Sequence, residues 1–354
     1  MIPNIIDSIG NTPLVRLNKS SPTDGNLFAK LELLNHFGMK DRVAKNIILQ
    51  AKKSGELKES ATIIESSSGT MALGVALIGT ALGHEVIIVT DPRIDPLTLA
   101  KLKALGANVH IVKNMDEKGW QGARLKYLYA LLEKHTDYFW PKQYENPDNP
   151  NSYKSLANEL VKELNKIDIL VGSVGSGGSL CGIAKALRID NPNLKVIAVD
   201  SVGSIIFDQP LNSHRLQGGL GNSIVPLNVQ HDKIDEVHWL NDDEAFESTL
   251  NLAKNEKIFA GNSSGSVYTV ASWVSKQVSD DCNIVAVFPD RGDRYYETIY
   301  NEKFREEHNV KLGRLSDGPK EILKNEVASN WSYCKLKGDS NGKSDKKTPL
   351  VYRV

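Results

Sequence analysis

A turn rich in glycine and serine separates two apolar stretches in the sequence GSVGSGGSLCGIAKAL, residues 172–187. The first stretch predicts a strand and the second a helix, so several backbone N–H groups would point to one spot at the helix N-terminus. These groups belong to Ser176, Gly177, Gly178 and Ser179. Together with the two serine hydroxyls they favour a phosphate dianion as ligand. A plain tight turn is the alternative.

A dinucleotide site is a second interpretation of this turn, because Asp200 ends the next predicted strand, where a ribose-binding carboxylate would stand. The glycine spacing argues against it. After Gly175 and Gly177 a third glycine should follow three residues on, but that position is Leu180. No Lys-Ser or Lys-Thr pair follows the glycines either, which excludes a Walker A loop. The turn therefore predicts phosphate binding without specifying a dinucleotide.

Lys40 stands directly ahead of a predicted helix, in FGMKDRVAKNIILQA, residues 37–51. The helix dipole disfavours a cation at this end, so the lysine is either fully solvated or is present for its amine. A desolvated amine near positive potential has a lowered pKa and can form a Schiff base. Taken alone, this feature favours the solvated lysine.

A second turn with hydroxyl side chains, in ESSSGTMALGVAL (65–77), precedes an almost wholly apolar helix pattern. Free N–H groups and hydroxyls at a helix N-terminus suit a substrate carboxylate, and an N-cap cluster without a ligand is the alternative. Segments 259–273 and 288–300 repeat the order strand, polar turn, helix. Four such units imply a shared cleft at the carboxyl ends of a sheet. The carboxylate turn would use Ser67, Ser68, Gly69, Thr70 and Met71.

The elements that must position these turns alternate along the chain. Short β-branched runs predict buried strands, and helix-period segments lie between them. This alternation predicts an α/β fold with mostly parallel sheets flanked by helices, and 354 residues suggest two domains at roughly 150 residues each. The strands are expected at 61–66, 85–90, 107–113, 168–173, 195–200, 235–241 and 283–289. Helices are expected at 43–51, with Gly55 as a stop, and at 96–106, 120–135 and 156–164.

Two segments interrupt this alternation. The segment ENPDNPNS (145–152) has two prolines and three asparagines and is the best candidate for a crossing between two sheet domains. The stretch 335–348 has one apolar residue in fourteen, which predicts a solvated tail, with a basic docking arm as the alternative.

The composition excludes several classes of protein. Lys+Arg and Asp+Glu both number 43, so the basic excess typical of a nucleic-acid or membrane-surface binder is missing. No apolar run is long enough to span a membrane, and the N-terminus resembles no secretory signal, so we expect a cytoplasmic protein. The cysteines, Cys181, Cys282 and Cys334, form no metal-binding pair and suggest a reducing compartment. No metal site is predicted.

In this order, the segments resemble the fold-type II pyridoxal-phosphate (PLP) enzymes, specifically the cysteine synthase and cystathionine β-synthase family. Residues 9–15 (IGNTPLV) resemble its N-terminal signature, and AKLE at 29–32 with Lys40-Asp41-Arg42 resembles its PLP-lysine motif. The similarity covers about residues 2–308. It implies a tryptophan synthase β-like fold with the active site between two domains: 43–145, and 1–42 with 146–308. An extension at 309–334 and a flexible tail at 335–354 would follow, and the enzyme would be a homodimer.

The resemblance also assigns roles to single residues. It implies that Lys40 is the catalytic residue and the Schiff-base lysine, and that 175–179 bind the phosphate of PLP. Ser263 matches the hydroxyl that faces the pyridine nitrogen, and Gln143 matches a glutamine that contacts the substrate carboxylate. Further cofactor contacts would come from Thr70, Pro289 and Asp290, and substrate contacts from 67–69 and Met71.

Two departures from the family pattern affect specificity. The segment 36–39 (HFGM) before Lys40 is one residue shorter than the usual Pro-Gly-Gly-Ser-x. The substrate loop, usually Thr-Ser-Gly-Asn-Thr-Gly, has Thr70 and Met71 at its asparagine and second threonine positions. The segments 91–94, 203–210 and 289–295 look closer to a siderophore-pathway branch, which joins an activated serine to glutamate on the way to 2,3-diaminopropionate.

The implied reaction is PLP-dependent β-replacement on O-acetylserine or O-phosphoserine through an aminoacrylate. Sulfide is the family's usual nucleophile. Alternatives are an amino-acid amine as nucleophile, β-elimination, and a PLP-binding regulatory homologue without catalysis.

Overall fold

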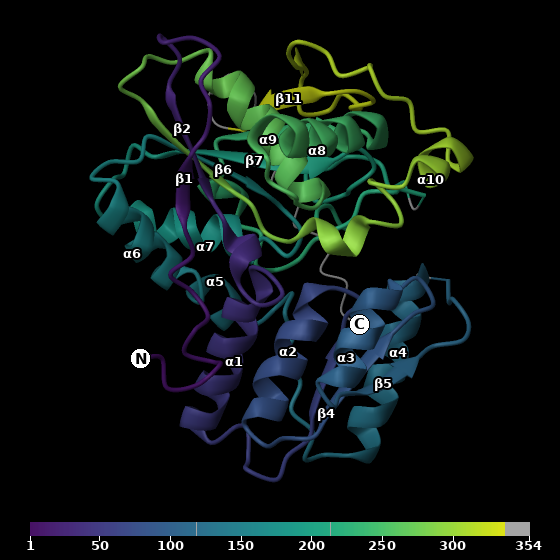
Figure 1. The fold of residues 1–354 in the computed structure, drawn as a ribbon. Coiled ribbons are helices and arrows are strands. Elements are labelled where there is room, and N and C mark those ends of the chain that lie inside the picture. The colour runs from purple at the N-terminus through teal and green to yellow at the C-terminus, as the bar shows by residue number, and fades with distance from the viewer. Residues whose placement is uncertain (118, 213, 337–354) are drawn as a thin grey trace.

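The computed structural model describes residues 1–117, 119–212 and 214–336. Within them, strands form an eight-stranded sheet in the order β1-β2-β9-β6-β7-β8-β11-β10 and a three-stranded sheet in the order β3-β4-β5. In Figure 1 the larger sheet occupies the upper half of the molecule, and β4 and β5 lie in the lower half with α2, α3 and α4. The strands are β1 Leu14–Arg16, β2 Asn26–Lys30, β3 Ile63–Ser66, β4 Val86–Thr90, β5 Asn108–Ile111, β6 Ile169–Ser173, β7 Lys195–Ser201, β8 Glu236–Leu240, β9 Asn283–Val287, β10 Lys320–Glu321 and β11 Ser332–Lys335.

The seven strands expected from sequence are all present, and they pair in parallel with one another. Four strands were not expected. All four lie at or next to the edges of the larger sheet, and β1 and β10 are largely exposed, so neither has the apolar run that marks a buried strand. The antiparallel pairs, β1 with β2 and β11 with β8, both involve these additional strands.

Helices cover both faces of the larger sheet. Neighbouring residues of one strand point to opposite faces, so Leu170 packs in one core cluster with Ile183 of α7, and Val171 packs in another with Val267 of α9. This two-sided burial confirms the predicted α/β fold. The helices are α1 Lys40–Ser54, α2 Thr70–Ala81, α3 Pro96–Ala104, α4 Gly119–Lys134, α5 Asp148–Asn151, α6 Lys154–Glu163, α7 Gly178–Leu187, α8 Asp242–Glu256, α9 Asn262–Ser275 and α10 Glu302–Glu307, with short 3₁₀ turns η1 Glu32–Leu34, η2 His231–Lys233 and η3 Gly292–Tyr295.

Local signals set several helix ends as expected. Gly55 closes α1 in the left-handed conformation with φ of 82°. Pro96 begins α3, and the side chain of Asp95 caps it by accepting from Thr98 N at 2.8 Å. The segment 145–152 lies on the path from the smaller sheet to β6, but it contains the short helix α5 and is not a turn alone.

The predicted start of the tail at Lys335 is wrong. Lys335 is the last residue of β11 and pairs with Glu236 of β8, and Leu336 N donates to Asp235 O at 2.8 Å. Composition misplaces the boundary because β11 is short and its pairing is made by the backbone. The rest of the predicted tail, 337–354, lies outside the described residues.

The larger sheet draws on both ends of the chain. Strands β1 and β2 precede the smaller sheet in sequence, but β2 pairs with β9 and β1 pairs with β2. Strand β10 comes from the expected 309–334 extension, and β11 extends from it to Lys335. The division into the domains 43–145 and 1–42 with 146–308 stays a prediction. Among the described residues, no helix combines the length and the apolar content needed to cross a membrane.

Candidate active site

Lys40 is the first residue of α1 and follows a tight turn. Gly38 has φ of 127°, and a Cβ there would lie 2.8 Å from the carbonyl oxygen of Pro289. The same carbonyl accepts a hydrogen bond from Met39 N at 2.8 Å, and the carboxylate of Asp41 accepts one from Phe37 N at 2.8 Å. The short segment 36–39, which ends directly before Lys40, is therefore held tightly against Pro289.

The amine of Lys40 points to the glycine-rich turn at 175–179. Its Nζ donates to Ser176 Oγ at 3.2 Å. The Lys40 side chain keeps some exposed surface, but the amine lies deep among protein atoms, and this desolvation lowers the pKa of Lys40 to about 8. The geometry favours a nucleophilic amine over a solvated lysine, since much of the amine is neutral near that pH.

Two glycines of this turn, Gly177 and Gly178, cannot be exchanged without a collision. Gly177 caps α7 with φ of 79°, and a Cβ there would lie 2.6 Å from Val229. At Gly178 a Cβ would lie 2.1 Å from Asn149 Oδ1. The first N–H groups of α7 have no carbonyl partner within the helix, so they remain available to an anion. Gly175, Ser176 and Ser179 belong to the same strand-to-helix connection between β6 and α7.

Asn149 joins Gln143 to this turn, a role that the sequence did not indicate. Its Nδ2 donates to Gln143 O at 2.6 Å and to Ser176 Oγ at 3.3 Å. Asn228 Nδ2 donates to the same carbonyl at 3.1 Å. Gln143 is buried, and its backbone is thus held next to the turn. Asparagines in a segment such as 145–152 are typical of loops, so their presence alone does not predict this contact.

The hydroxyl-rich turn at 67–71 lies beside Lys40 because α1 and α2 pack closely. A Cβ at Gly74 of α2 would lie 3.1 Å from the carbonyl oxygen of Lys40 and 3.1 Å from Ala44 Cβ. Ser67 is buried, and its Oγ accepts from Gly69 N at 3.2 Å. Ser68, Gly69 and Thr70 are partly exposed, and α2 begins at Thr70.

Met71 differs from its neighbours in this turn. Its side chain is 2% exposed and packs in the main hydrophobic core cluster. Met71, which stands where the family usually has a small polar residue, therefore lies in apolar surroundings. A direct contact between Met71 and substrate stays a prediction.

Ser263 and Asp290 come together at the start of α9. Gly261, the N-cap of α9, donates its N–H to Asp290 O at 3.1 Å, and a Cβ at Gly261 would lie 2.5 Å from Asp290 Oδ1. Ser263 is fully buried, and its Oγ makes no hydrogen bond of normal geometry, although it lies near enough to Asp290 to lower the pKa of that carboxyl. Burial has the larger effect and raises the pKa of Asp290 overall.

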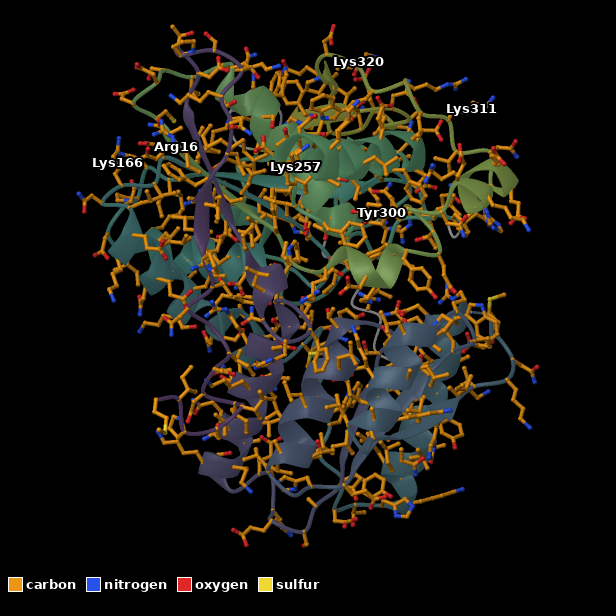
Figure 2. The ribbon with its side chains drawn as sticks, viewed as in Figure 1. Arg16, Lys166, Lys257, Tyr300, Lys311 and Lys320 are labelled. Atoms are coloured by element: carbon orange, nitrogen blue, oxygen red, sulfur yellow. The ribbon has the colours of Figure 1, made fainter. Side chains whose placement is uncertain are left out.

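The turn that carries Asp290 is anchored by aromatic residues. Tyr295 OH donates to Asp290 Oδ2 at 2.8 Å, and Tyr300 OH donates to Ala260 O at 2.7 Å. Tyr300 also packs on Phe259, with ring centroids 4.1 Å apart. Figure 2 shows Tyr300 in the lower part of the upper half of the molecule. Residues 289–295 are thus fixed against the N-terminus of α9.

Asp200, the residue that had suggested a dinucleotide, faces no ligand space. It is fully buried, its Oδ1 accepts from Ser201 N at 2.8 Å, and burial raises its pKa to about 7. A ribose-binding carboxylate needs access to the ligand. Among the described residues, no group of three or more His, Cys, Asp or Glu side chains could hold a metal ion.

Three features of the described residues fit pyridoxal phosphate. The desolvated amine of Lys40 can bond to its aldehyde, and the N-terminus of α7 can hold its phosphate where glycines leave room. The buried Ser263 hydroxyl, which makes no hydrogen bond of normal geometry, suits the ring nitrogen. The residues that match the PLP motifs therefore fit the group they would hold.

Comparison with known proteins agrees with this chemistry. The family model described as pyridoxal-phosphate dependent enzyme matches residues 5–290. The chain is 30% identical to an O-acetylserine dependent cystathionine β-synthase from Helicobacter pylori, with a TM-score of 0.79, and the match covers 85% of this chain and 99% of that one. It is 30% identical to O-acetyl serine sulfhydrylase isoform 3 from Entamoeba histolytica (TM-score 0.80, 88% and 96% covered).

A third solved structure is a hydrogen sulfide-producing enzyme from Fusobacterium nucleatum, 30% identical with a TM-score of 0.78, for which 83% of this chain and 100% of that chain are covered. The family match extends over most of the chain, and the fold, the glycine turns and the PLP motifs agree with it. The chain is therefore a pyridoxal-phosphate dependent enzyme of the cysteine synthase and cystathionine β-synthase family.

Proposed function

We propose that this enzyme replaces the β-substituent of an activated serine, O-acetylserine or O-phosphoserine, with a nucleophile. The observation that carries the proposal is the position of the Lys40 amine, 3.2 Å from Ser176 in the glycine-rich turn and at the helix start against which α2 packs. The names of the similar structures support it, since two of them refer to O-acetylserine.

Each group has a chemical task in this reaction. Bound pyridoxal phosphate supplies an electron sink that weakens the α-C–H bond of an attached amino acid. The free Lys40 amine removes the α-proton, because its lowered pKa keeps much of it neutral at mildly alkaline pH. The N-terminus of α7, with residues 175–179, holds the phosphate. The start of α2 at 67–71 and Gln143 hold the substrate carboxylate.

Ser263 would contact the ring nitrogen, and Pro289 and Asp290 would form the wall behind it. The cleft lies between the smaller domain, 43–145, and the larger one, 1–42 with 146–308. We infer a homodimer, as the resemblance to the family implies. Sulfide is the proposed nucleophile, and an amino-acid amine such as that of glutamate is the alternative to be tested beside it.

The test supplies the PLP-loaded protein with each serine ester, first alone and then with sulfide or with glutamate. Mass spectrometry identifies cysteine, an N-linked glutamate product or pyruvate from elimination. We expect loss of the acetyl or phosphate group and one dominant replacement product. If the loaded protein releases no β-substituent from either donor, the proposal is wrong.

A further inference from the structure

Arg294 lies between the cofactor side and the substrate side of the site, and the reaction outlined above gives it no role. It belongs to η3, after β9 of the larger sheet. Its side chain is 17% exposed, so most of the guanidinium is out of water. A buried guanidinium remains charged and needs matching carboxylates nearby.

On the cofactor side, Arg294 holds Asp290. Its Nη1 donates to Asp290 Oδ2 at 3.1 Å, beside the hydroxyl of Tyr295 at 2.8 Å. The other carboxylate oxygen, Oδ1, has no hydrogen bond of normal geometry, and Ser263 is close enough to influence the carboxyl. Arg294 therefore fixes the carboxylate that stands next to the proposed partner of the ring nitrogen.

On the substrate side, Arg294 touches two segments of the smaller-sheet half. Its Nε lies 3.6 Å from Asp95 Oδ2, the N-cap of α3. A Cβ at Gly69 would lie 3.4 Å from Arg294 Nη2, so the guanidinium packs on the N-cap of α2, in the proposed carboxylate turn. Arg294 Nε itself is buried without a hydrogen bond of normal geometry, so its interaction with Asp95 is mainly electrostatic.

We propose that Arg294 is a positioning residue, which keeps Asp290 against Ser263 on one side and the substrate turn in register with the cofactor on the other. The two carboxylates come from separate parts of the fold, Asp290 after β9 and Asp95 before α3. A shift of either part changes the ion pairs of the same guanidinium. The inference rests on the proposed function, because it takes this cleft as the site of PLP and the amino acid.

Three variants and a control separate the two sides. Arg294→Gln removes the bridge. Asp95→Asn removes the charge on the substrate side but keeps a good N-cap for α3. Arg294→Lys retains the charge without the fork that reaches both carboxylates. Arg291→Gln is the matched control, because Arg291 lies in the same turn with a half-exposed side chain paired to Asp293 at 2.7 Å.

The readouts are the visible absorption spectrum of the PLP-loaded protein and its spectral titration with L-alanine, which has no β leaving group. We expect Arg294→Gln to change the spectrum and to weaken alanine binding about tenfold or more, since small displacements at a reacting centre have large effects. Asp95→Asn should weaken binding about threefold and leave the spectrum unchanged. Arg294→Lys should lie between these, and Arg291→Gln should stay within about twofold of wild type.

A further variant guards against misfolding. Asp290→Asn with Arg294→Gln removes both charges of the more buried ion pair, so it should fold even if Arg294→Gln does not. If this double variant binds alanine as tightly as wild type and has its spectrum, Arg294 has no positioning role. The same conclusion follows if Arg294→Gln behaves like Arg291→Gln. A wild-type protein that binds PLP and alanine but acts on no serine ester would refute the proposed reaction. The alanine titration would then still test the positioning role of Arg294.

Discussion

At the scale of single residues, burial changes the chemistry of side chains that sequence shows only as charged. Lys40 is at a helix N-terminus, where an exposed ammonium would be disfavoured. Its amine is desolvated instead and donates to Ser176, and the pKa of Lys40 is lowered to about 8. The helix dipole and burial both disfavour a positive charge at Lys40. The position that is poor for an ammonium ion therefore favours the neutral, reactive amine.

Replacing Lys40 with alanine should abolish turnover but leave the fold. In the proposed reaction the amine both bonds to the cofactor and moves a proton, so we expect a loss of about 10³-fold or more in product formation. Circular dichroism and the urea midpoint should stay close to wild type. Lys45→Ala, on the same helix and partly exposed, is the control and should keep its activity. A Lys40→Ala protein with more than a tenth of wild-type turnover would contradict the assignment.

Glu65, next to the substrate turn, should make stability depend on pH. It is 1% exposed, and burial raises its pKa from 4.5 to about 7. Between these values the native state keeps a proton that the unfolded state releases. The stabilisation is therefore fully present below about pH 4.5 and is lost as pH rises through about 7.

Glu65→Gln should flatten this dependence in the cofactor-free protein. Between pH 5 and 7 the free energy of unfolding, measured with urea, should fall less steeply than in wild type, by up to about 1.4 kcal/mol per pH unit. Glu59→Gln, at an exposed position, should leave the curve unchanged. Parallel curves for Glu65→Gln and wild type would show that Glu65 releases its proton at the same pH in both states.

At the scale of elements, the contact between α1 and α2 sets the distance between the lysine and the substrate turn. Gly74 permits it, because a Cβ there would lie 3.1 Å from both Lys40 O and Ala44 Cβ. The phosphate turn is on α7 and does not depend on this contact. Cofactor binding and amino-acid binding can therefore be perturbed separately.

Gly74→Val should push α2 from α1 and move the substrate turn relative to Lys40. We expect a loss of stability of about 1–3 kcal/mol from overpacking, and a fall in activity of up to about 100-fold from misplaced reacting groups. The affinity for PLP should change much less. Thr80→Val, near the C-terminus of α2, is the control for the effect of introducing a valine into this helix. Activity that stays at the wild-type level in Gly74→Val would mean that the turn is positioned by other contacts.

At the scale of the whole molecule, the C-terminal extension completes the larger sheet. Strand β11 pairs antiparallel with β8, and Ser332 and Cys334 are buried. Trp331 Nε1 donates to His238 Nδ1 at 3.2 Å, so the extension also covers a buried histidine of β8. This edge is far along the sheet from β9 and the turn at 289–295.

A chain that ends after Trp331 should be less stable, while one that ends after Leu336 should match the full-length protein. Loss of β11 removes its hydrogen bonds to β8 and exposes apolar surface, on the order of 2–3 kcal/mol. Residues 337–348, most of the stretch removed in the longer chain, contain no apolar residue. The measurement is the urea midpoint of unfolding for the two truncated proteins and for the full-length chain. Equal midpoints for all three would show that β11 adds no stability.

Sequence by itself determined the buried strands, the helix ends and the chemistry-bearing turns of this protein. Buried parallel strands are continuous β-branched runs, and Gly55 and Pro96 act through their own backbone preferences, so these signals are local. The sequence also identified Gly175, Gly177, Gly178 and Lys40 as candidate site residues. The family motifs made the cofactor predictable, because PLP needs an amine and an anion site at fixed places in the chain.

Only the tertiary structure decided which of these residues meet. Asn149 joins Gln143 to Ser176, Met71 is buried in the core, and Arg294 connects Asp95 with Asp290. Strands β1 and β10 are short and largely exposed, and β11 depends on hydrogen bonds to β8, a partner distant in sequence, so their own residues carry little pattern. Desolvation is likewise a property of the surroundings, because the pKa values of Lys40 and Glu65 shift only when distant segments exclude water from them.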